Sequence, residues 1–274
     1  MAIRRFAQVD VFSPEPWRGN PVAVVLDGGE LDDAEMQAFA RWTNLSETTF
    51  VLEPTVAGAD YRVRIFTPQQ ELPFAGHPTL GTCHAWLEAG GRPAGETIVQ
   101  ECPAGLIEIR RTDDGLAFAA PPLIRSGPAD QVLIERVLDD LGLARDEVLD
   151  VHWVDNGPGW LGVLVGSAAR VLALEPTLTV HDDVGVVGLH PDGTPEIRAF
   201  FMANGVQLED PVTGSLNASL AQWLLGAGHI SAPYTARQGT AIERAGRIHV
   251  TLDDFGTIWI AGATTTVIEG SAEL

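Results

Sequence analysis

The chain has 274 residues and a formal net charge of −20, with 37 acidic residues against 17 basic ones. This length predicts one or two domains, and 45% hydrophobic residues predict a globular protein. The acidic balance disfavours nucleic acid and anionic membranes as partners, since both are bound by clustered cations. All the basic residues are arginine, so the absence of lysine excludes Schiff-base catalysis and a Walker A phosphate loop.

The two cysteines, Cys83 and Cys102, give neither a disulfide framework nor a structural zinc set, and we expect reduced thiols. The first residues contain no long apolar run, so no signal peptide or membrane anchor is predicted there. Both observations favour a cytoplasmic protein.

In the first half of the chain, short strand-like runs surround two helices. Asp32 and Glu35 have the spacing of a capping box and open a helix that runs to about Trp42. Gly76 and the two residues after it lead into a second, mostly apolar helix over 79–89. The predicted strands are 22–26, 48–52, 61–66, 97–99, 106–109 and 116–119.

The second half begins after a Pro-rich stretch, 121–128, which is the best candidate linker. An amphipathic helix over 129–141 ends at Gly142, and a mostly apolar helix over 215–225 has Ser215 as its expected N-cap. The stretch 181–183 is interpreted as a solvated loop. The predicted strands are 151–154, 161–165, 170–174, 184–189, 196–202, 247–252, 257–261 and 265–268.

The two halves resemble each other. The run 63–66 precedes one glycine loop and apolar helix, and the run 197–200 precedes another, about 134 to 138 residues later. A mostly apolar helix among many strands is best buried inside a curled sheet. We therefore predict an α+β fold with two domains, residues 1–125 and 126–274. The last strand of the chain could cross back into the first domain. A ligand site is expected in a cleft between them.

Two glycine loops open helices, at Gly76 and at Gly214. A helix N-terminus offers free amides and the positive end of the helix dipole, so the two loops can hold a carboxylated small molecule. The alternative is ordinary helix capping at both places. A Gly-x-Gly-x-x-Gly pattern over 157–162 is followed by a strand-like run, which disfavours a dinucleotide site.

Three residues are candidates for proton transfer. Glu47 lies among apolar and hydroxyl residues, where desolvation would suit it to act as a base, although an exposed strand-edge glutamate fits as well. His77 opens a helix and is either structural or an acid/base group, and Asp210 either orients the second glycine loop or belongs to a simple Asp-Pro turn. A hydrolase triad of His77, Asp210 and Ser215 is less favoured, because no Gly-x-Ser-x-Gly elbow exists. No metal-ligand motif is evident.

Several segments together resemble the PhzF family of phenazine-biosynthesis isomerase-like proteins. They follow the family's order over nearly the whole chain. The matching stretches are Val9–Phe12, Gly19–Val25, Leu45–Phe50, Phe74–Thr79 and Glu209–Ser215, with Gln238-Gly239 and Arg244–Gly246 near the end.

The resemblance implies a diaminopimelate-epimerase-like fold, in which two similar domains each wrap strands around a central helix. It implies a cofactor-independent isomerase in which Glu47 moves a proton within a small carboxylated substrate, assisted by His77 and Asp210. Ser215 and the backbones of Gly76 and Gly214 would hold the substrate carboxylate. By the same motifs, Asn20, Ser46 and Thr213 would also contact substrate.

The epimerase relatives use a cysteine at each glycine loop, whereas neither Cys83 nor Cys102 lies there, so a two-thiol mechanism is disfavoured. Members of the family are often dimers, and a homodimer is expected on that ground. Two other functions stay open: an epimerase or racemase of an amino-acid-like substrate, and a non-catalytic ligand-binding protein on the same fold.

Overall fold

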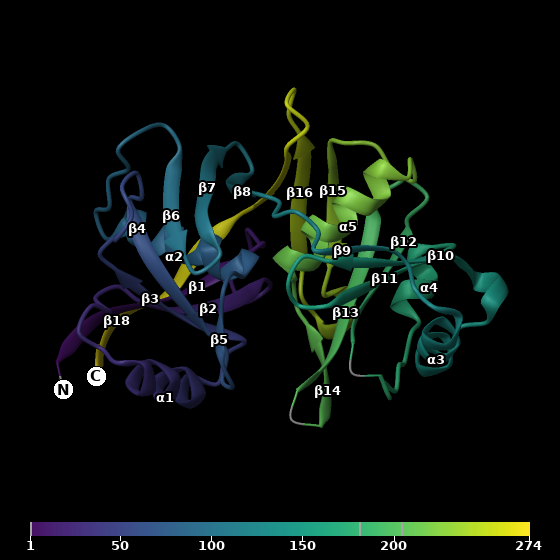
Figure 1. Cartoon of the computed structure of the whole chain (residues 1–274), viewed down its shortest axis with the longest axis horizontal. Helices are drawn as coiled ribbons and strands as arrows, with labels where there is room; N and C mark the ends of the chain where they lie inside the picture. Colours follow the sequence, from purple (N-terminus) through teal and green to yellow (C-terminus); the bar gives the residue numbers. More distant parts are fainter. Residues whose placement is uncertain (1, 181, 204) are drawn as a thin grey trace. The chain divides into compact units, whose positions relative to one another are not determined.

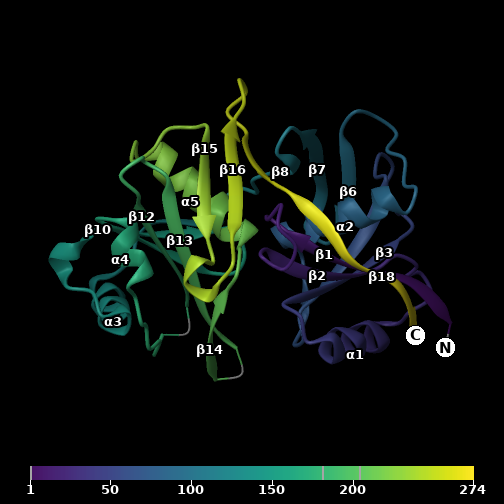
Figure 2. The same cartoon turned by 180° about the vertical axis from the view of Figure 1, so that it is seen from behind.

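The computed structural model describes residues 2–180, 182–203 and 205–274, and it divides the chain into two compact units (Figures 1 and 2). The first unit consists of Met1–Ala119 together with Ala261–Leu274, and the second consists of Ala120–Ile260. The end of the chain therefore belongs to the same unit as its beginning.

The first unit is a mixed sheet with two helices. Its strands pair in the order β18–β1–β2–β3–β4–β6–β7–β8, and the short β5 also pairs with β4. The pairs β2/β3 and β4/β6 are parallel, and the other pairs are antiparallel. The elements are β1 (Ile3–Val11), β2 (Asn20–Val25), α1 (Asp33–Thr43), β3 (Glu47–Leu52), β4 (Tyr61–Phe66), β5 (Glu71–Leu72), α2 (Gly76–Glu88), β6 (Ile98–Cys102), β7 (Gly105–Thr112), β8 (Gly115–Ala119) and β18 (Thr264–Glu273).

The second unit is built in the same manner. Its strands pair in the order β9–β10–β11–β12–β13–β15–β16, and β14 also pairs with β13. The elements are β9 (Arg125–Pro128), α3 (Gln131–Leu141), η1 (Arg145–Glu147), β10 (Val148–Asp155), β11 (Trp160–Val165), α4 (Ala168–Leu172), β12 (Asp183–Leu189), β13 (Pro195–Ala203), β14 (Val206–Asp210), α5 (Gly214–Gly226), β15 (Tyr234–Gln238), η2 (Thr240–Ile242), β16 (Gly246–Leu252) and β17 (Ile258–Gly262), which crosses the boundary between the units.

The sense of strand pairing repeats from one unit to the other. In the first unit the pairs β1/β2, β3/β4, β4/β5 and β6/β7 are antiparallel, and the pairs β2/β3 and β4/β6 are parallel. In the second unit the corresponding pairs have the same senses: β10/β11, β12/β13, β13/β14 and β15/β16 are antiparallel, and β11/β12 and β13/β15 are parallel. In each unit the apolar helix, α2 or α5, follows the short second strand of a hairpin. This is the pattern that an internal duplication would leave.

The helices α2 and α5 are buried nearly all round. Each has 13 residues, of which nine are buried. Helix α2 contacts β1, β2, β3, β8 and β18, and Figure 1 shows it surrounded by strands of its unit. Gly81 allows the close approach, because a Cβ there would collide with Val22 on β2. Each sheet is therefore curled around one central helix, as predicted.

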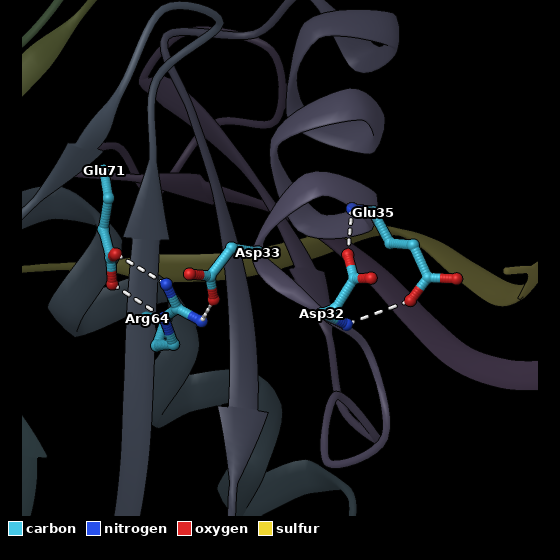
Figure 3. Close-up of polar contacts among 5 residues, drawn as sticks. All are labelled: Asp32, Asp33, Glu35, Arg64 and Glu71. Atoms are coloured by element: carbon cyan, nitrogen blue, oxygen red, sulfur yellow. Dashed lines mark hydrogen bonds and ion pairs between the residues drawn. The ribbon is translucent and has the colours of Figure 1, made fainter.

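Helix α1 begins with the capping box that the sequence predicts, and Figure 3 shows its two hydrogen bonds. The Glu35 amide donates to the Asp32 carboxylate at 2.9 Å, and the Asp32 amide donates to the Glu35 carboxylate at 2.9 Å. The helix ends at Asn44, which adopts a left-handed conformation with φ 55°. Its inner face packs against Phe50 and Phe66.

An arginine–glutamate pair occurs at the same place in both units, and it is more deeply buried in the second. On β4, Arg64 donates from Nε and Nη2 to the Glu71 carboxylate of β5, at 2.7 and 2.6 Å (Figure 3). On β13, Arg198 donates in the same way to Glu209 of β14, at 2.9 and 2.7 Å. Both guanidinium groups also lie over the phenylalanine two residues further on. Each pair therefore links the two strands of the hairpin that precedes a glycine loop.

Three segments differ from what the sequence predicted. Residues 170–174 are not a strand: Ser167 caps the short helix α4, accepting a hydrogen bond from the Arg170 amide at 3.3 Å. The stretch 121–128 is not simply a linker, because its end forms β9, which pairs with β10. Asp183 is the first residue of β12 and not part of a solvated loop, whereas His181 lies outside the described residues.

Candidate functional site

The N-terminus of α2 carries no side-chain cap. Its N-cap residue is Ala75, which has no side-chain hydrogen bond to the first turn, and Gly76 and His77 follow as buried residues. The Thr79 amide donates to the Ala75 carbonyl at 3.2 Å, and this hydrogen bond begins the helix. The amides of Gly76 and His77 precede the hydrogen-bonded part of the helix, so they are suited to hold an anion.

Asn20 and Glu47 are brought to His77 by two neighbouring strands. Asn20 is the first residue of β2 and Glu47 the first residue of β3, and the two strands are parallel neighbours with Val22 opposite Glu47. Parallel neighbours begin at the same edge of a sheet, and His77 lies there at the start of α2. The sequence motifs, far apart along the chain, therefore meet in the first unit.

The His77 ring lies between the other two side chains. Its Nε2 is 3.2 Å from Glu47 Oε2, and its Nδ1 is 3.3 Å from the amide nitrogen of Asn20. His77 Nε2 and Glu47 Oε2 do not form a hydrogen bond with each other, although the distance is within hydrogen-bond reach. Contacts of this kind commonly tighten when substrate binds.

Burial sets the charge state of this histidine. His77 is 5% exposed, and burial lowers its pKa to about 3, while a hydrogen bond with the Pro21 backbone acts in the opposite direction. At neutral pH the ring is therefore a neutral imidazole, with one nitrogen as donor and the other as acceptor. It can pass a proton or polarise a substrate atom without adding a positive charge to the site.

A buried aspartate that sequence reasoning assigned no role holds the loop before Asn20. Asp10 is 2% exposed, and its Oδ2 accepts from the amides of Arg18 and Gly19 at 3.0 Å each. The signal was a single acid inside the otherwise apolar run Val9–Phe12. Such an acid needs buried donors, so this pattern could have indicated a loop clamp.

In the second unit the loop before α5 is held by side chains. Asp210 accepts from the Thr213 hydroxyl at 2.5 Å, and the buried Gln238 accepts from the Thr213 amide at 3.0 Å. Gln238 also donates to the Asp210 carbonyl at 3.1 Å. Asp210 and Thr213 thus shape the loop itself, and Gln238 was recognised as part of a motif without a role.

Ser215 is not the N-cap that we expected. Thr213 is the N-cap residue of α5 and makes no side-chain capping bond, so Gly214 and Ser215 belong to the first turn. The Ser215 hydroxyl instead accepts from the Trp160 indole at 3.1 Å, and its carbonyl accepts from Asn156 at 2.9 Å. The amides at this N-terminus therefore remain available for an anion, as at α2.

Asp183 is an acid that the sequence interpretation missed. Burial raises the pKa of this carboxyl group to about 7, with further contributions from the charges of Asp182, Asp210 and Asp155. It is the first residue of β12, opposite Trp160 on β11. It can therefore carry a proton near neutral pH close to the loop that precedes α5.

The cysteines are not at the glycine loops. Cys83 lies inside α2 and is 0% exposed, and burial raises the pKa of its thiol to about 12. Burial also raises the pKa of Cys102, on β6. Neither thiol forms the reactive thiolate readily, which argues further against a two-thiol mechanism.

The structure thus collects the predicted residues into one group in each unit. In the first unit Asn20, Glu47, Gly76 and His77 gather at the start of α2, while Ser46, next to Glu47, is exposed. In the second unit the group at the start of α5 is Asp210, Thr213, Gly214 and Ser215.

Comparisons with known proteins identify the family of the chain. The family model described as PhzC-PhzF, phenazine biosynthesis-like protein, matches residues 9–270. A trans-2,3-dihydro-3-hydroxyanthranilate isomerase of Pseudomonas aeruginosa is 35% identical, with 99% of this chain and 100% of that protein covered. Antisense-enhancing sequence 1 of Schizosaccharomyces pombe is 36% identical, with 99% of both chains covered.

A solved structure confirms the fold. The Bacillus anthracis phenazine biosynthesis protein of the PhzF family superposes with a TM-score of 0.82, covering 100% of both chains at 24% identity. The α+β prediction is therefore correct. Separately, none of the described helices is long and apolar enough to cross a membrane.

Proposed function

Because the chain belongs to the PhzC-PhzF family of phenazine biosynthesis-like proteins and is an isomerase, we propose that it moves a proton within a small carboxylated substrate by general acid–base catalysis. The observation that carries the proposal is the group at the start of α2. A carboxylate, Glu47, lies 3.2 Å from the neutral imidazole of His77, beside helix amides that no side chain caps.

Each part of this group supplies one requirement of a proton shift. Glu47 removes the proton from a substrate carbon and returns it at another carbon. The neutral His77 ring hydrogen-bonds the charge that develops, and the Gly76 and His77 amides hold the substrate carboxylate. A positioned acid or base contributes roughly 10²–10⁴-fold to the rate.

We propose that Asp210, Thr213, Gly214 and Ser215 take part in the same reaction. Asp210 would relay or orient a proton, and the amides at the start of α5 would bind a polar group of the substrate. Support comes from the matching position of the two glycine loops in the repeated topology. The variant Asp210→Asn tests the proposed proton role, and an unchanged rate and KM would remove Asp210 from the proposal.

We propose that the substrate is a cyclic carboxylic acid that bears an amino group. This follows the name of the Pseudomonas aeruginosa relative, a trans-2,3-dihydro-3-hydroxyanthranilate isomerase. Such a compound combines an anion for a helix N-terminus with a carbon acid next to a conjugated system. The other partner we propose is a second copy of the chain, and light scattering of the purified protein checks whether it is a homodimer.

The test is the exchange of substrate carbon protons in heavy water, followed by mass spectrometry over a panel of small cyclic carboxylic acids. Glu47→Gln should lower exchange by at least about 100-fold while the melting temperature stays near that of the wild type. Glu53→Gln, the same change at an exposed position after β3, should leave exchange unchanged. Full exchange by Glu47→Gln would refute the assignment of the base.

The products of the same experiment separate the alternatives. A shifted double bond together with incorporated deuterium defines an isomerase of the proposed kind. Deuterium at an inverted stereocentre with no shifted double bond would define an epimerase. Binding of a panel compound without any exchange, in the wild type and in Glu47→Gln alike, would define a ligand-binding protein.

A further inference from the structure

We propose that the first unit carries a second binding site, for a free amino acid with an apolar side chain, at the C-terminal end of α2. A cavity of about 500 Å³ lies there, which is a size common among small-molecule sites. Its walls are the start of β1, the segments that follow β2 and β3, and the end of α2 with the residues after it. The described residues that line it all belong to the first unit.

This cavity is separate from the group that contains Glu47 and His77. Those two residues lie at the start of β3 and of α2. The cavity is lined instead by Leu52, the last residue of β3, and by Ala89, which follows α2. Helix α2 has 13 residues and therefore spans about 20 Å. The proposal thus goes beyond the proposed function and does not depend on it.

Arg4 is the lining residue that indicates a ligand. Its side chain is buried, and its Nε has no hydrogen-bond partner within the described part of the chain. Nη1 donates to the Asp27 carbonyl. Nη2 lies 3.8 Å from the carboxylate of Glu30, beyond hydrogen-bond distance, and that glutamate is 88% exposed. A buried donor without an acceptor is unfavourable, so an acceptor at Nε and Nη2 would stabilise the site.

Carboxylates occupy this same edge on other arginines of the chain. Arg198, which is 7% exposed against 8% for Arg4, donates from Nε and Nη2 to Glu209. Arg5, next to Arg4, donates from the same two nitrogens to Asp27. Such two-point pairs are the preferred way in which a guanidinium binds a carboxylate. We therefore infer that Arg4 binds the carboxylate of the ligand.

The end of α2 favours a cation in the same cavity. Ala89, Gly90 and Gly91 line it, and the last turn of this fully described helix carries no basic residue. The last carbonyls of a helix and the negative end of its dipole attract positive charge. Among the described lining residues two are arginines and four are acidic, which disfavours a doubly charged anion such as phosphate. An amino acid supplies one carboxylate and one ammonium group.

The remaining wall is apolar. Trp86 stacks on the buried ring of Tyr61, with centroids 4.9 Å apart. Gly91 packs closely against the indole, since a Cβ there would lie 2.3 Å from it. The indole is thus held in one orientation. Leu26 and Val51 also line the cavity, so its apolar part suits an aliphatic or aromatic side chain.

The test is isothermal titration calorimetry of the full chain, with L-phenylalanine and L-leucine as probes. At least one should bind saturably at one site per chain. The analogues 3-phenylpropionate and 4-methylpentanoate lack the ammonium group, and the two amino-acid amides lack the carboxylate. Each should bind at least about 10-fold more weakly than its parent amino acid.

Three results with the wild type would overturn the proposal. The first is the absence of saturable binding by both amino acids up to about 10 mM. The second is equal binding of the analogues without an ammonium group. The third is tighter binding of inorganic phosphate, because the second and third results would each indicate a simple anion site.

Variants locate the site. Arg4→Met should weaken binding at least about 10-fold, whereas Arg41→Met, the same change at an exposed position of α1, should leave it unchanged. Glu47→Gln should bind as the wild type does. Unchanged affinity in Arg4→Met, or lost binding in Glu47→Gln, would contradict the assignment. The outcome for Glu47→Gln is independent of whether that variant retains proton exchange.

A further variant decides if Arg4→Met does not fold. Glu30→Gln changes an exposed side chain and removes the carboxylate that competes for Arg4 Nη2. It should tighten binding about two- to fivefold, as expected for an exposed ion pair. Weaker or unchanged binding in Glu30→Gln would show that Arg4 does not hold the ligand carboxylate.

Discussion

At the scale of single residues, Asp183 makes the stability of the protein depend on pH. Its folded pKa of about 7 lies above the ordinary value of 3.8, so the unfolded chain releases this proton first as pH rises. Stability should therefore fall between about pH 4 and pH 7, at up to about 1.4 kcal/mol per pH unit. Asp183→Asn should remove this slope, which urea unfolding at about pH 5 and about pH 8 measures.

The control for that measurement is Asp254→Asn, which removes an acid from an exposed turn. It should leave the difference between the two pH values as in the wild type. If Asp183→Asn also retained the full difference, burial of this carboxyl would not be the cause of the slope.

The sequence predicted single residues well where a motif joins several of them. Glu47 and His77 were identified as candidates, and they lie side by side. Asn20 was also identified, but its partner was not, because a contact between residues 57 apart depends on how β2 and α2 pack. Asp183 was missed for a similar reason, since burial of an acid arises from tertiary structure and leaves no local pattern.

At the scale of elements, the two arginine–glutamate pairs should differ in strength. Arg198 and Glu209 have side chains 8% and 12% exposed, whereas Arg64 and Glu71 are 15% and 31% exposed. Removing one partner of a buried pair leaves an uncompensated charge and costs about 3–5 kcal/mol. Arg198→Met should therefore destabilise the protein by about 3 kcal/mol, and also strip the Leu174 carbonyl of its donor.

Arg64→Met is the matched variant in the first unit and should cost less, because its two partners, Glu71 and Asp33, can be hydrated. Urea unfolding of both variants measures the difference. Equal losses would mean that burial does not set the strength of these pairs. The double variant Arg198→Met with Glu209→Leu should recover part of the loss, since no charge is then left unpaired.

Elements were predictable where local signals agree. The capping box at Asp32 and the glycine after Leu141 marked helix ends that the structure confirms. The run 170–174 misled because Val and Leu suit both strand and helix, and the cap at Ser167 decides for the helix. The edge strand β9 was hidden by its prolines and glycine, which usually indicate a loop.

At the scale of the whole molecule, the first unit needs the end of the chain. Strand β18 pairs with β1 along nine residues, from Ile3 to Val11. Deleting residues 261–274 should therefore leave α1 and α2 with fast hydrogen exchange, while α5 in the second unit stays protected. Deleting only 271–274, which pair with the first residues of β1, should have a small effect. Unchanged protection of α2 in the longer deletion would contradict this.

The repeat was visible in the sequence as an offset of about 134 to 138 residues between similar runs. What the sequence did not show is the sense of strand pairing, because parallel and antiparallel neighbours are chosen by long-range contacts. Only the structure shows that the succession of senses is the same in both units.

The pairing of β18 with β1 also affects how the protein folds during translation. On the ribosome, β1 emerges before β18. It cannot pair with β18 until the whole of Ala120–Ile260 has been translated. The second unit is continuous, so the later-made half can reach its native form while the earlier-made half is incomplete. During that interval β1 exposes an unpaired edge, and we expect nascent-chain chaperones to be recruited there.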